Sequence, residues 1–386
     1  MVIRARFEVV AVPFECGTAS ILQKVCAVPL LYACMESARS GENSGSSQSG
    51  GVPCPFVWAV SQNALSTFRL FFDLAVHSVS PTRLFIGLDA GASKTLLRAQ
   101  YLNRDVSFER RGPGANPNRV GASQAAATLV DLITEAMKDG PDADWVSVCA
   151  GVAGAGRTQA QEQITDALRR ALSHPERTVH VEVVHDALIA LDAAYDAGSG
   201  LIVIAGTGSV VLGRTTEGEL LRAGGWGHLL GDDGSGHAIG QAGLRAVAIA
   251  FDGGPSTTLC ARVQDRFGIN DRESLLETVY RQDFNVQTVA PLVLDAAANG
   301  DAVASDLLST QVKKLSKQVA RLLNRDVPVS PRITLIGGML RHDHYADCLR
   351  RCLQNRCADW TIGVLQDEPV LGALRRARRQ KQETAR

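Results

Sequence analysis

From about residue 82 onward, short apolar runs alternate along the chain with longer stretches of helical periodicity. Residues 84–88, 145–151 and 201–209 are apolar and bounded by turn residues, which is typical of buried β-strands. Residues 121–138 and 158–172 instead repeat apolar side chains at helical spacing, as amphipathic helices do. Strands that alternate with helices in this way predict an α/β fold.

The remaining segments extend this pattern. Further strands are expected at residues 96–102, 107–112, 179–186, 210–216, 219–225, 332–338 and 361–365, and further helices at 187–195, 235–251, 272–280, 289–299, 302–323 and 369–379.

The pattern restarts near residue 200. Residues 84–88 and 201–209 each lead into a glycine turn and are followed by a partner strand. Two halves that open in this way predict two similar α/β domains that face a central cleft. We expect an N-terminal lobe at 82–197, a C-terminal lobe at 198–368, and a C-terminal helix at 369–382 that packs on the first lobe.

Residues 1–81 lie outside this pattern. Residues 9–34 are apolar, but Glu15, Lys24 and two prolines interrupt them, so we expect neither a membrane-spanning helix nor a signal peptide. Residues 40–51 are rich in Ser and Gly, as flexible linkers are. We therefore expect residues 1–81 to be a poorly ordered extension, or sequence upstream of the true start.

The composition narrows the choice of partners. The 386 residues include 40 Lys and Arg and 40 Asp and Glu, so the formal net charge is zero. This balance favours neither nucleic acid nor an anionic membrane as a partner. Nine cysteines in a chain of this length favour free thiols in a reducing cytoplasm. Cys348, Cys352 and Cys357 have helical spacing without a Cys-x-x-Cys pair, which argues against a metal site.

Two glycine turns offer a place for an anion. Residues 89–95 (DAGASKT) and 206–209 (GTGS) each lie between predicted strands, with small residues at the tip. Successive backbone N–H groups without bulky side chains bind anionic oxygen, so two facing turns could hold the β- and γ-phosphates of a nucleotide. A plain β-hairpin turn is the alternative for each. Neither turn has the P-loop spacing, and no G-x-G-x-x-G opens a helix after a strand. The turns also offer hydroxyl groups, from Ser93, Thr95, Thr207 and Ser209.

Asp186 stands between the two turns, where a predicted strand meets a predicted helix. It could be an N-cap that accepts hydrogen bonds from the first helical turn. A carboxylate at the carboxyl end of a strand also points into the crevice where α/β proteins bind ligands. There it could accept the proton of a substrate hydroxyl that attacks a phosphoryl group.

The segment 224–237 (GGWGHLLGDDGSGH) combines many glycines with two adjacent aspartates. Glycine lets the backbone approach a ligand closely, and Asp232 supplies a strong acceptor for a hydroxyl-rich ligand such as a sugar. We expect Trp226 and His228 to wall this pocket. The alternative, a strained loop with solvated aspartates, leaves Trp226, Leu229 and Leu230 unexplained.

Together these motifs resemble those of the N-acetylglucosamine kinases and their relatives in the BadF/BadG-type ATPase family, within the actin/hexokinase superfamily. The resemblance begins at about residue 83 and extends to the C-terminus. It is carried by GLDAGASKT (87–95), GPGANPN (112–118), VCAGVAGAGR (148–157), VVHDA (183–187), GTGSV (206–210), GGWGHLLGDDGSG (224–236), LIGGM (335–339) and PVLGAL (369–374).

The resemblance implies a ribonuclease-H-like fold in each lobe, with ATP and Mg²⁺ in the cleft between them. It also implies transfer of the γ-phosphoryl group to the 6-hydroxyl of an amino sugar, N-acetylglucosamine or glucosamine, with Asp186 as the general base and Asp89 near the metal. The implied nucleotide-binding residues are Asp89, Gly91, Ala92, Ser93, Lys94, Thr95, Gly206, Thr207, Gly208, Ser209, Gly337 and Gly338, and the implied sugar-binding residues are Asn116, Ala153, Gly154, Thr207, Gly225 and Asp232.

Some positions depart from the family pattern. Ala90, Ala92 and Ser93 stand where the family often has Gly, Gly and Thr, and Asp233 stands where Glu is usual. Because an alanine methyl group restricts positive φ, we expect the first turn to lie slightly further from a phosphate. Asp233 is one methylene shorter than Glu, so we expect its contact with the sugar hydroxyls to be altered. These departures bear on substrate identity and rate rather than on the class of reaction.

Two other functions stay open on the sequence. An ATP-driven activator of the BadF/BadG type would need cysteines around an iron–sulfur cluster, and neither Cys149 in a predicted strand nor the isolated Cys260 suggests one. A sugar sensor would bind sugar without turning over ATP, although no basic helix-turn-helix segment precedes the kinase-like region. A homodimer is compatible with the resemblance, and the sequence does not decide whether the sugar is acetylated.

Overall fold

The structure is a computed structural model of the chain, and it describes residues 82–102, 106–156, 158–281 and 283–383. These residues belong to one compact unit, Val79–Arg386. The predicted N-terminal extension, residues 1–81, lies outside the described residues. Within the described ranges, no helix combines the length and the apolar character needed to cross a membrane.

The first half of the molecule is built on a five-stranded sheet with the order β3-β2-β1-β4-β5. β1, β2 and β3 are antiparallel, whereas β1, β4 and β5 are parallel. Its elements are β1 (Arg83–Ala90), β2 (Lys94–Tyr101), β3 (Ser107–Pro113), α4 (Pro117–Val120), α5 (Ala122–Lys138), β4 (Trp145–Val152), α6 (Thr158–Leu172), β5 (Thr178–His185) and α7 (Asp186–Tyr195).

Side chains of β1 fill two layers of the core. Leu84, Ile86 and Leu88 are buried with residues of α5 and α6, whereas Phe85 is buried with residues of α7 on the other face. This is the alternation expected of a strand that is covered on both faces.

The second half repeats this plan. Its five-stranded sheet has the order β10-β9-β6-β7-β8, with β6, β7 and β8 antiparallel and β6, β9 and β10 parallel. Three antiparallel strands followed by two parallel ones therefore occur in both sheets, which confirms the predicted α/β fold with two similar lobes. The elements are β6 (Gly200–Ala205), β7 (Ser209–Arg214), β8 (Leu220–Gly224), α8 (Gly236–Phe251), α9 (Leu259–Phe267), α10 (Arg272–Val279), η1 (Val286–Val289), α11 (Ala290–Ala298), α12 (Ala302–Leu323), β9 (Arg332–Ile336), η2 (Gly338–Arg341), α13 (Asp343–Gln354) and β10 (Thr361–Val364).

Besides the four-residue α4, two helices were not predicted from the sequence, α9 and α13. Both are mostly polar, and each buries only a narrow row of side chains, Leu259 and Val263 in α9 and Tyr345 and Leu349 among those in α13. Both helices are nevertheless strongly amphipathic, so their periodicity was present in the sequence and was missed.

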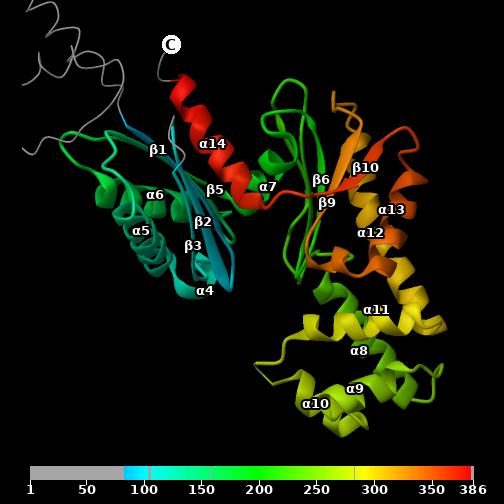
Figure 1. Ribbon diagram of the computed structural model, residues 1–386. Helices are drawn as coiled ribbons and strands as arrows, with labels where there is room; N and C mark the ends of the chain where they lie inside the picture. Colours follow the sequence, from blue (N-terminus) through cyan, green and yellow to red (C-terminus); the bar gives the residue numbers. More distant parts are fainter. Residues whose placement is uncertain (1–81, 103–105, 157, 282, 384–386) are drawn as a thin grey trace, which may run out of the picture. The chain divides into compact units, whose positions relative to one another are not determined.

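The last helix, α14 (Pro369–Glu383), packs against the first half of the molecule. A Cβ atom at Gly372 would lie 1.9 Å from the carbonyl oxygen of Ile189 in α7, and one at Gly87 in β1 would lie 2.5 Å from the nitrogen of Leu374. Figure 1 shows α14 beside these elements. Because the backbones touch at two glycines, α14 is fixed against both α7 and β1.

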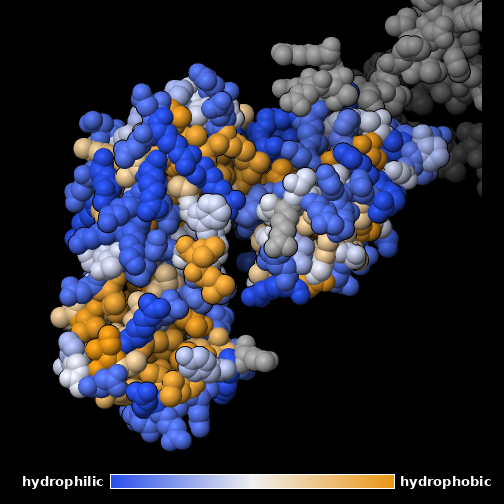
Figure 2. Space-filling view, turned by 180° about the vertical axis from the view of Figure 1, so that it is seen from behind, coloured by the Kyte–Doolittle hydropathy of each residue, from blue (hydrophilic) through white to orange (hydrophobic). Residues whose placement is uncertain are grey.

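The helices of the second half bury one face and leave apolar groups on another. Val247 and Val293 belong to the core, whereas Ile249, Leu276 and Tyr280 are exposed. Figure 2 shows apolar side chains gathered over this helical part.

Candidate functional site

The first glycine turn, residues 91–93, joins β1 to β2. The Gly91 N–H donates to the carbonyl oxygen of Lys94 at 2.9 Å, which closes the turn. Ala92 and Ser93 are exposed, and their N–H groups have no acceptor among the described residues. The turn therefore presents two successive donors at its tip, an arrangement that binds anionic oxygen.

The hydroxyl of Thr95 was expected to lie at this turn, but it does not. Its side chain is buried, and the hydroxyl donates to the carbonyl oxygen of Pro113 at 2.7 Å. The reason is that Thr95 is the second residue of β2, so strand alternation turns it into the sheet. Ser93 and Lys94, by contrast, are exposed.

Asp89 and Asp186 form a carboxylate pair at the carboxyl end of the first sheet. Asp89 is the penultimate residue of β1, and Asp186 directly follows β5. Burial, and after it the negative charge of Asp186, raise the pKa of Asp89 from 3.8 to about 6. Lys94 opposes this shift, and Glu368 adds to it. A partly desolvated carboxylate beside a second one favours a bound cation or a proton.

Asp186 is the first residue of α7, whereas the N-cap, for which Asp186 was one candidate, is His185. Asp186 Oδ1 lies 2.7 Å from His185 Nδ1 and accepts the Ala187 N–H at 2.8 Å. The same Ala187 N–H also donates to His185 Nδ1 at 3.2 Å, so the imidazole caps the helix beside Asp186. The side chain of Asp186 remains 38% exposed, which leaves a carboxylate oxygen accessible to a ligand.

Residues implied in sugar binding lie beside the first turn. The Ala153 N–H donates to the carbonyl oxygen of Ala90 at 2.8 Å, so the loop after β4 adjoins the end of β1. A Cβ atom at Gly154 would lie 2.2 Å from Oδ1 of Asn116. The Asn118 amide nitrogen donates to the Gly154 carbonyl oxygen at 3.3 Å. The fold thus brings Asn116, Ala153 and Gly154 together from separate parts of the sequence.

The second glycine turn, residues 206–208, joins β6 to β7. The Gly206 N–H donates to the carbonyl oxygen of Gly208 at 2.9 Å, and the N–H groups of Thr207 and Gly208 have no acceptor within the described part of the chain. This turn also presents two successive donors. Ser209, expected to offer its hydroxyl to the turn, is buried and donates that hydroxyl to the Asp233 carbonyl oxygen at 2.8 Å.

Asp232 braces the second turn. Its side chain is buried, and Oδ1 accepts the Ser209 N–H at 3.2 Å. A Cβ atom at Gly208 would lie 2.8 Å from Oδ2. Asp232 itself has a φ of 64°, which is uncommon for a residue other than glycine. Asp232 thus supports the second turn, and its contact with a sugar stays a prediction.

The start of α8 adjoins the same turn. The N–H groups of Gly236 and His237 donate to the carbonyl oxygens of Gly206 and Thr207 at 2.8 and 3.1 Å. The N-terminus of this 16-residue helix carries a partial positive charge, which favours an anion at the turn. Gly236 was not among the residues predicted for the site, although Ser235 before a helical pattern is an N-cap signal.

The predicted nucleotide residues Gly337 and Gly338 follow β9. A Cβ atom at Gly337, where φ is 120°, would lie 2.2 Å from the carbonyl oxygen of Ala205, whereas one at Gly338 would meet nothing within 4 Å. Met339 lies close to Gly236, since its sulfur would be 3.2 Å from a Cβ there. The loop after β9 therefore meets the second turn and the start of α8.

Trp226 and His228, expected to wall the sugar pocket, lie in an exposed part of the glycine-rich segment. Trp226, Leu229 and Leu230 are 73%, 85% and 81% exposed, and His228 is also exposed. Gly225, an implied sugar residue, has a φ of 68°, which favours glycine at this position.

A hollow of about 240 Å³ is lined by residues of both halves, namely Gln161, Val184, His185, Ala187, Leu188, Val210, Leu212, Leu220 and Arg222. His185 contacts Asp186, and Arg222 donates to the carbonyl oxygen of Gly225 at 2.6 Å. Neighbours of the candidate base and of a candidate sugar residue thus line one space.

The donor set for metals is small. Among the described residues, no group of three or more His, Cys, Asp or Glu side chains is placed to hold a metal ion. Mg²⁺ is commonly held by one or two carboxylates together with phosphate oxygens, so Asp89 and Asp186 fit this ion in the presence of a nucleotide. Cys149 is buried in β4, and burial raises the pKa of its thiol.

Comparison with known proteins gives a consistent result. The sequence model described as the BadF/BadG/BcrA/BcrD ATPase family matches residues 86–375. An N-acetylmuramic acid/N-acetylglucosamine kinase of Clostridium acetobutylicum is 32% identical over 299 residues, which cover 75% of this chain and 96% of the relative. An N-acetyl-D-glucosamine kinase of Dictyostelium discoideum is 28% identical over 260 residues, covering 60% of this chain and 80% of that protein.

Solved structures agree at the level of the fold. The crystal structure of a proposed N-acetylglucosamine kinase from Chromobacterium violaceum superposes with a TM-score of 0.62 and 23% identity, covering 76% of this chain and 98% of that one. A second proposed N-acetylglucosamine kinase, from Porphyromonas gingivalis, gives a TM-score of 0.56 at 21% identity, with coverage of 77% and 99%. These likenesses confirm the predicted fold class.

Proposed function

The chain belongs to the BadF/BadG/BcrA/BcrD ATPase family, and from this premise we propose that it is a sugar kinase. We infer that it transfers the γ-phosphoryl group of ATP to the 6-hydroxyl of an amino sugar, N-acetylglucosamine or glucosamine. The printed activities of its relatives support the substrate class. The observation that carries the proposal is the Asp89–Asp186 carboxylate pair beside a turn with unpaired N–H groups.

Asp186 is the general base in this proposal. Its carboxylate is accessible, and the Ala187 N–H holds one oxygen in place. A base positioned in this way takes the proton of the sugar hydroxyl as that oxygen attacks phosphorus, which contributes about 10²–10⁴ to the rate. The Ala187 N–H, as the donor to Asp186, orients the carboxylate.

The nucleotide is proposed to bind through its phosphates at the two turns. The N–H groups of Ala92 and Ser93, and those of Thr207 and Gly208, are the donors, and the N-terminus of α8 adds positive potential. Asp89 would hold Mg²⁺ together with phosphate oxygens, and the ion would supply charge neutralisation there. The adenosine is assigned to the region of Gly337 and Gly338.

The sugar is assigned to the residues that border both turns, Asn116, Ala153, Gly154, Thr207, Gly225 and Asp232. Asn116 and Gly154 are in contact, and Gly225 is in contact with Arg222 at the hollow described above. Hydroxyl groups of a sugar need such fixed donors and acceptors at short range.

The test is a coupled assay of ADP release with MgATP and a panel of glucose, glucosamine, N-acetylglucosamine and N-acetylmuramic acid. We expect turnover with at least one amino sugar, and product phosphorylated at the 6-hydroxyl by NMR. Asp186→Asn is expected to lose at least about 10²-fold in kcat without a change in melting temperature. Asp166→Asn, at an exposed carboxylate of α6, is the matched control and should retain the wild-type rate.

The same assay separates the alternatives. ATP hydrolysis without any phosphorylated sugar would favour an activator ATPase. Sugar binding without ATP turnover would favour a sensor. Wild-type kcat in Asp186→Asn would remove Asp186 from its assigned role.

A further inference from the structure

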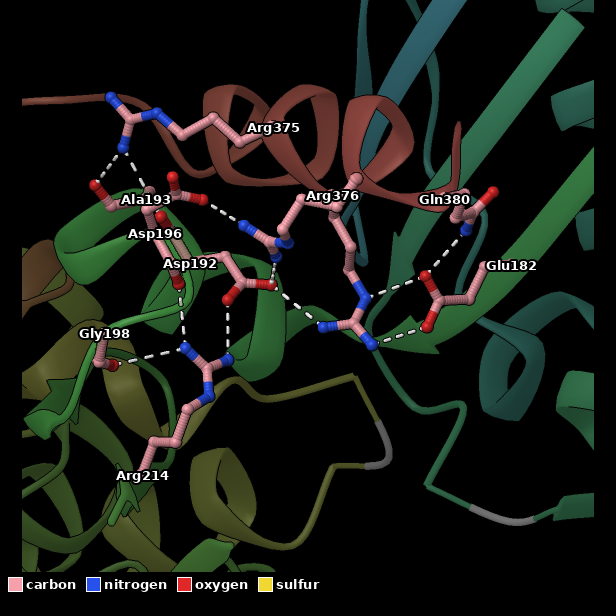
Figure 3. Close-up of polar contacts among 10 residues, drawn as sticks. Glu182, Asp192, Ala193, Asp196, Gly198, Arg214, Arg375, Arg376 and Gln380 are labelled. Atoms are coloured by element: carbon pink, nitrogen blue, oxygen red, sulfur yellow. Dashed lines mark hydrogen bonds and ion pairs between the residues drawn. The ribbon is translucent and has the colours of Figure 1, made fainter. Parts of the chain in front are cut away.

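Asp192 is a buried carboxylate that the proposed chemistry does not use. It lies in α7, its side chain is fully buried, and it is paired with three guanidinium groups. Arg214 lies 2.6 Å from Oδ1, while Arg376 and Arg379 lie 3.0 and 2.9 Å from Oδ2. Figure 3 shows the carboxylate between Arg214 on one side and Arg376 on the other.

These arginines come from elements of both halves of the molecule. Arg214 is the last residue of β7, in the second sheet. Arg376 and Arg379 lie on α14, which packs against the first sheet. A single carboxylate of α7 therefore joins β7 to α14.

Arg214 and the neighbouring Arg375 also bind the two segments in which the chain passes from one sheet to the other. The first passage, residues 196–199, links α7 to β6, and Arg214 donates to the carbonyl oxygens of Asp196 and Gly198 at 2.8 and 3.3 Å. The second passage, residues 365–368, links β10 to α14. There Arg375 pairs with Asp367 at 2.7 Å and donates to the Ala193 carbonyl oxygen of α7 at 2.7 Å.

Arg376 is fixed by a second carboxylate as well. Its Nε and Nη2 atoms lie 2.8 and 2.5 Å from the two carboxylate oxygens of Glu182, in β5. Gln380 donates to the same Glu182 at 2.8 Å, which Figure 3 also shows. The guanidinium group of Arg376 is thus bound by Glu182 as well as by Asp192, which fixes its position.

The anchored end of α7 determines where the other end lies. α7 has 10 residues, and Asp186 and Asp192 are on it. Six residues of α-helix span about 9 Å, over which a helix is rigid. Gly372 of α14 touches α7 midway, because a Cβ there would lie 1.9 Å from the Ile189 carbonyl oxygen. A shift at Asp192 is therefore transmitted to Asp186.

Burying a carboxylate among guanidinium groups is a costly way to gain stability. Apolar residues of similar volume often stabilise a core as well or better, whereas charged groups with directional bonds specify one geometry. We propose that Asp192 is a positioning residue: held by Arg214 from the second sheet and by Arg376 and Arg379 from α14, it fixes α7 so that Asp186 is aimed at the substrate hydroxyl. This inference rests on the proposed kinase function.

The experiment compares Arg214→Lys with wild type. Lysine keeps the charge but cannot reach Asp192 and the carbonyl oxygens of Asp196 and Gly198 together. We expect kcat to fall about 10–100-fold with the KM values for sugar and ATP within threefold, since a small misplacement of a catalytic group slows the chemical step. Backbone amides of residues 189–192 should exchange hydrogen at least about tenfold faster, as the helix loosens.

Arg177→Lys is the matched control. Arg177 is half-buried, whereas Arg214 is buried, and it also donates to two carbonyl oxygens, of Ala143 and Leu172, but within the first half and at the far end of β5. It should change neither kcat nor exchange in α7. Asp192→Asn should lower kcat further than Arg214→Lys, and if that variant does not fold, Arg214→Lys carries the test.

The possible results separate the positioning role of Asp192 from the proposed function. Wild-type kcat in a folded Arg214→Lys protein, or an equal loss in Arg177→Lys, overturns the positioning role. A raised KM at constant kcat also overturns it, because that pattern reports binding. A wild-type protein without sugar phosphorylation sinks the proposed function instead, and the exchange comparison still decides whether the cluster fixes α7.

Discussion

The two sheets have the same strand order, yet their glycine turns are held in different ways. The first turn is braced by backbone: the Ala115 N–H donates to the Gly91 carbonyl oxygen at 3.1 Å, and a Cβ at Gly114 would lie 2.3 Å from the Ala92 carbonyl oxygen. The second turn is braced by the Asp232 carboxylate and by the start of α8. Two sheets of the same topology thus support their glycine turns by different contacts.

The difference extends to charge. At the first turn the mostly buried carboxylate of Asp89 and the partly exposed carboxylate of Asp186 repel one another. At the second turn the Asp232 carboxylate is satisfied by an N–H of the turn, and a helix N-terminus lies alongside. The first half therefore combines N–H donors for an anion with a carboxylate pair suited to a cation or a proton, whereas the second half is suited to an anion.

The largest effect is expected where the second turn is packed most tightly. Gly337→Ala places a methyl group 2.2 Å from the Ala205 carbonyl oxygen at a φ of 120°. We expect a loss of about 3–5 kcal/mol in the free energy of unfolding, from overpacking and backbone strain together. Urea denaturation measures it. Gly338→Ala is the control, since a methyl group there meets nothing within 4 Å, and equal losses would refute the packing account.

The next prediction is a change in the free energy of unfolding that has opposite signs in the two halves. Asp89→Asn removes a carboxylate whose pKa is raised to about 6, and at pH 7 it should stabilise the protein by about 3 kcal/mol. Asp232→Asn removes a carboxylate that accepts the Ser209 N–H and should destabilise by about 1–3 kcal/mol. Thermal melts of both variants at pH 7 measure the two changes in stability. Changes of the same sign would contradict the contrast between the halves.

The pH dependence gives a second check on Asp89. Between about pH 4 and 6 the folded protein keeps the proton of Asp89 that the unfolded chain has released. Wild-type stability from this group should therefore fall as the pH rises through that window. Asp89→Asn should lack this slope, so its advantage over wild type should vanish below about pH 4.

Within the second turn, two glycines should respond differently. Gly208→Ala places a methyl group 2.8 Å from the Asp232 carboxylate and should destabilise by about 1–3 kcal/mol. Gly206→Ala meets nothing within 4 Å, so its stability should stay within about 0.5 kcal/mol of wild type. Its methyl group lies where a phosphate is proposed, so ATP affinity should fall instead. Melting curves and ATP titrations separate the two effects.

Local features of this site could be predicted from sequence. The glycine turns, the end of a strand before Asp186 and the helix after it all follow from residues close together in the chain. Thr95 and Ser209 show the limit of that reading. Each hydroxyl was assigned to a turn by proximity, but each residue already belongs to the following strand and points into the fold.

Long-range pairs could not be predicted in the same way. Asp89 and Asp186 come together only because β1, β4 and β5 are parallel neighbours, which no local pattern specifies. Asp232 reaches Ser209 through a segment with several positive φ values, and Asp192 meets arginines from β7 and α14. The resemblance to a family supplied residue roles for the first two cases and nothing for the third.

The smallest effect is expected at the rim of the hollow. Arg222 in β8 is exposed and donates to the carbonyl oxygens of Gly224 and Gly225 at 3.3 and 2.6 Å. Arg222→Ala should cost less than about 1 kcal/mol in stability, because exposed polar contacts contribute little. The KM for sugar should nevertheless rise about 3–10-fold, since Gly225 loses the group that holds its carbonyl oxygen at the proposed sugar site.

Arg110 gives the counterpart in the first half. It lies on the edge strand β3, as Arg222 lies on β8, and donates to the Glu109 carbonyl oxygen at 2.9 Å. Arg110→Ala should match Arg222→Ala in stability and leave the KM for sugar unchanged, because β3 carries no residue assigned to the sugar. If both variants raise KM equally, the edge strands act only through general loosening. If Arg222→Ala alone does so, the second edge strand takes part in sugar binding, and the two halves differ in function even at their outermost strands.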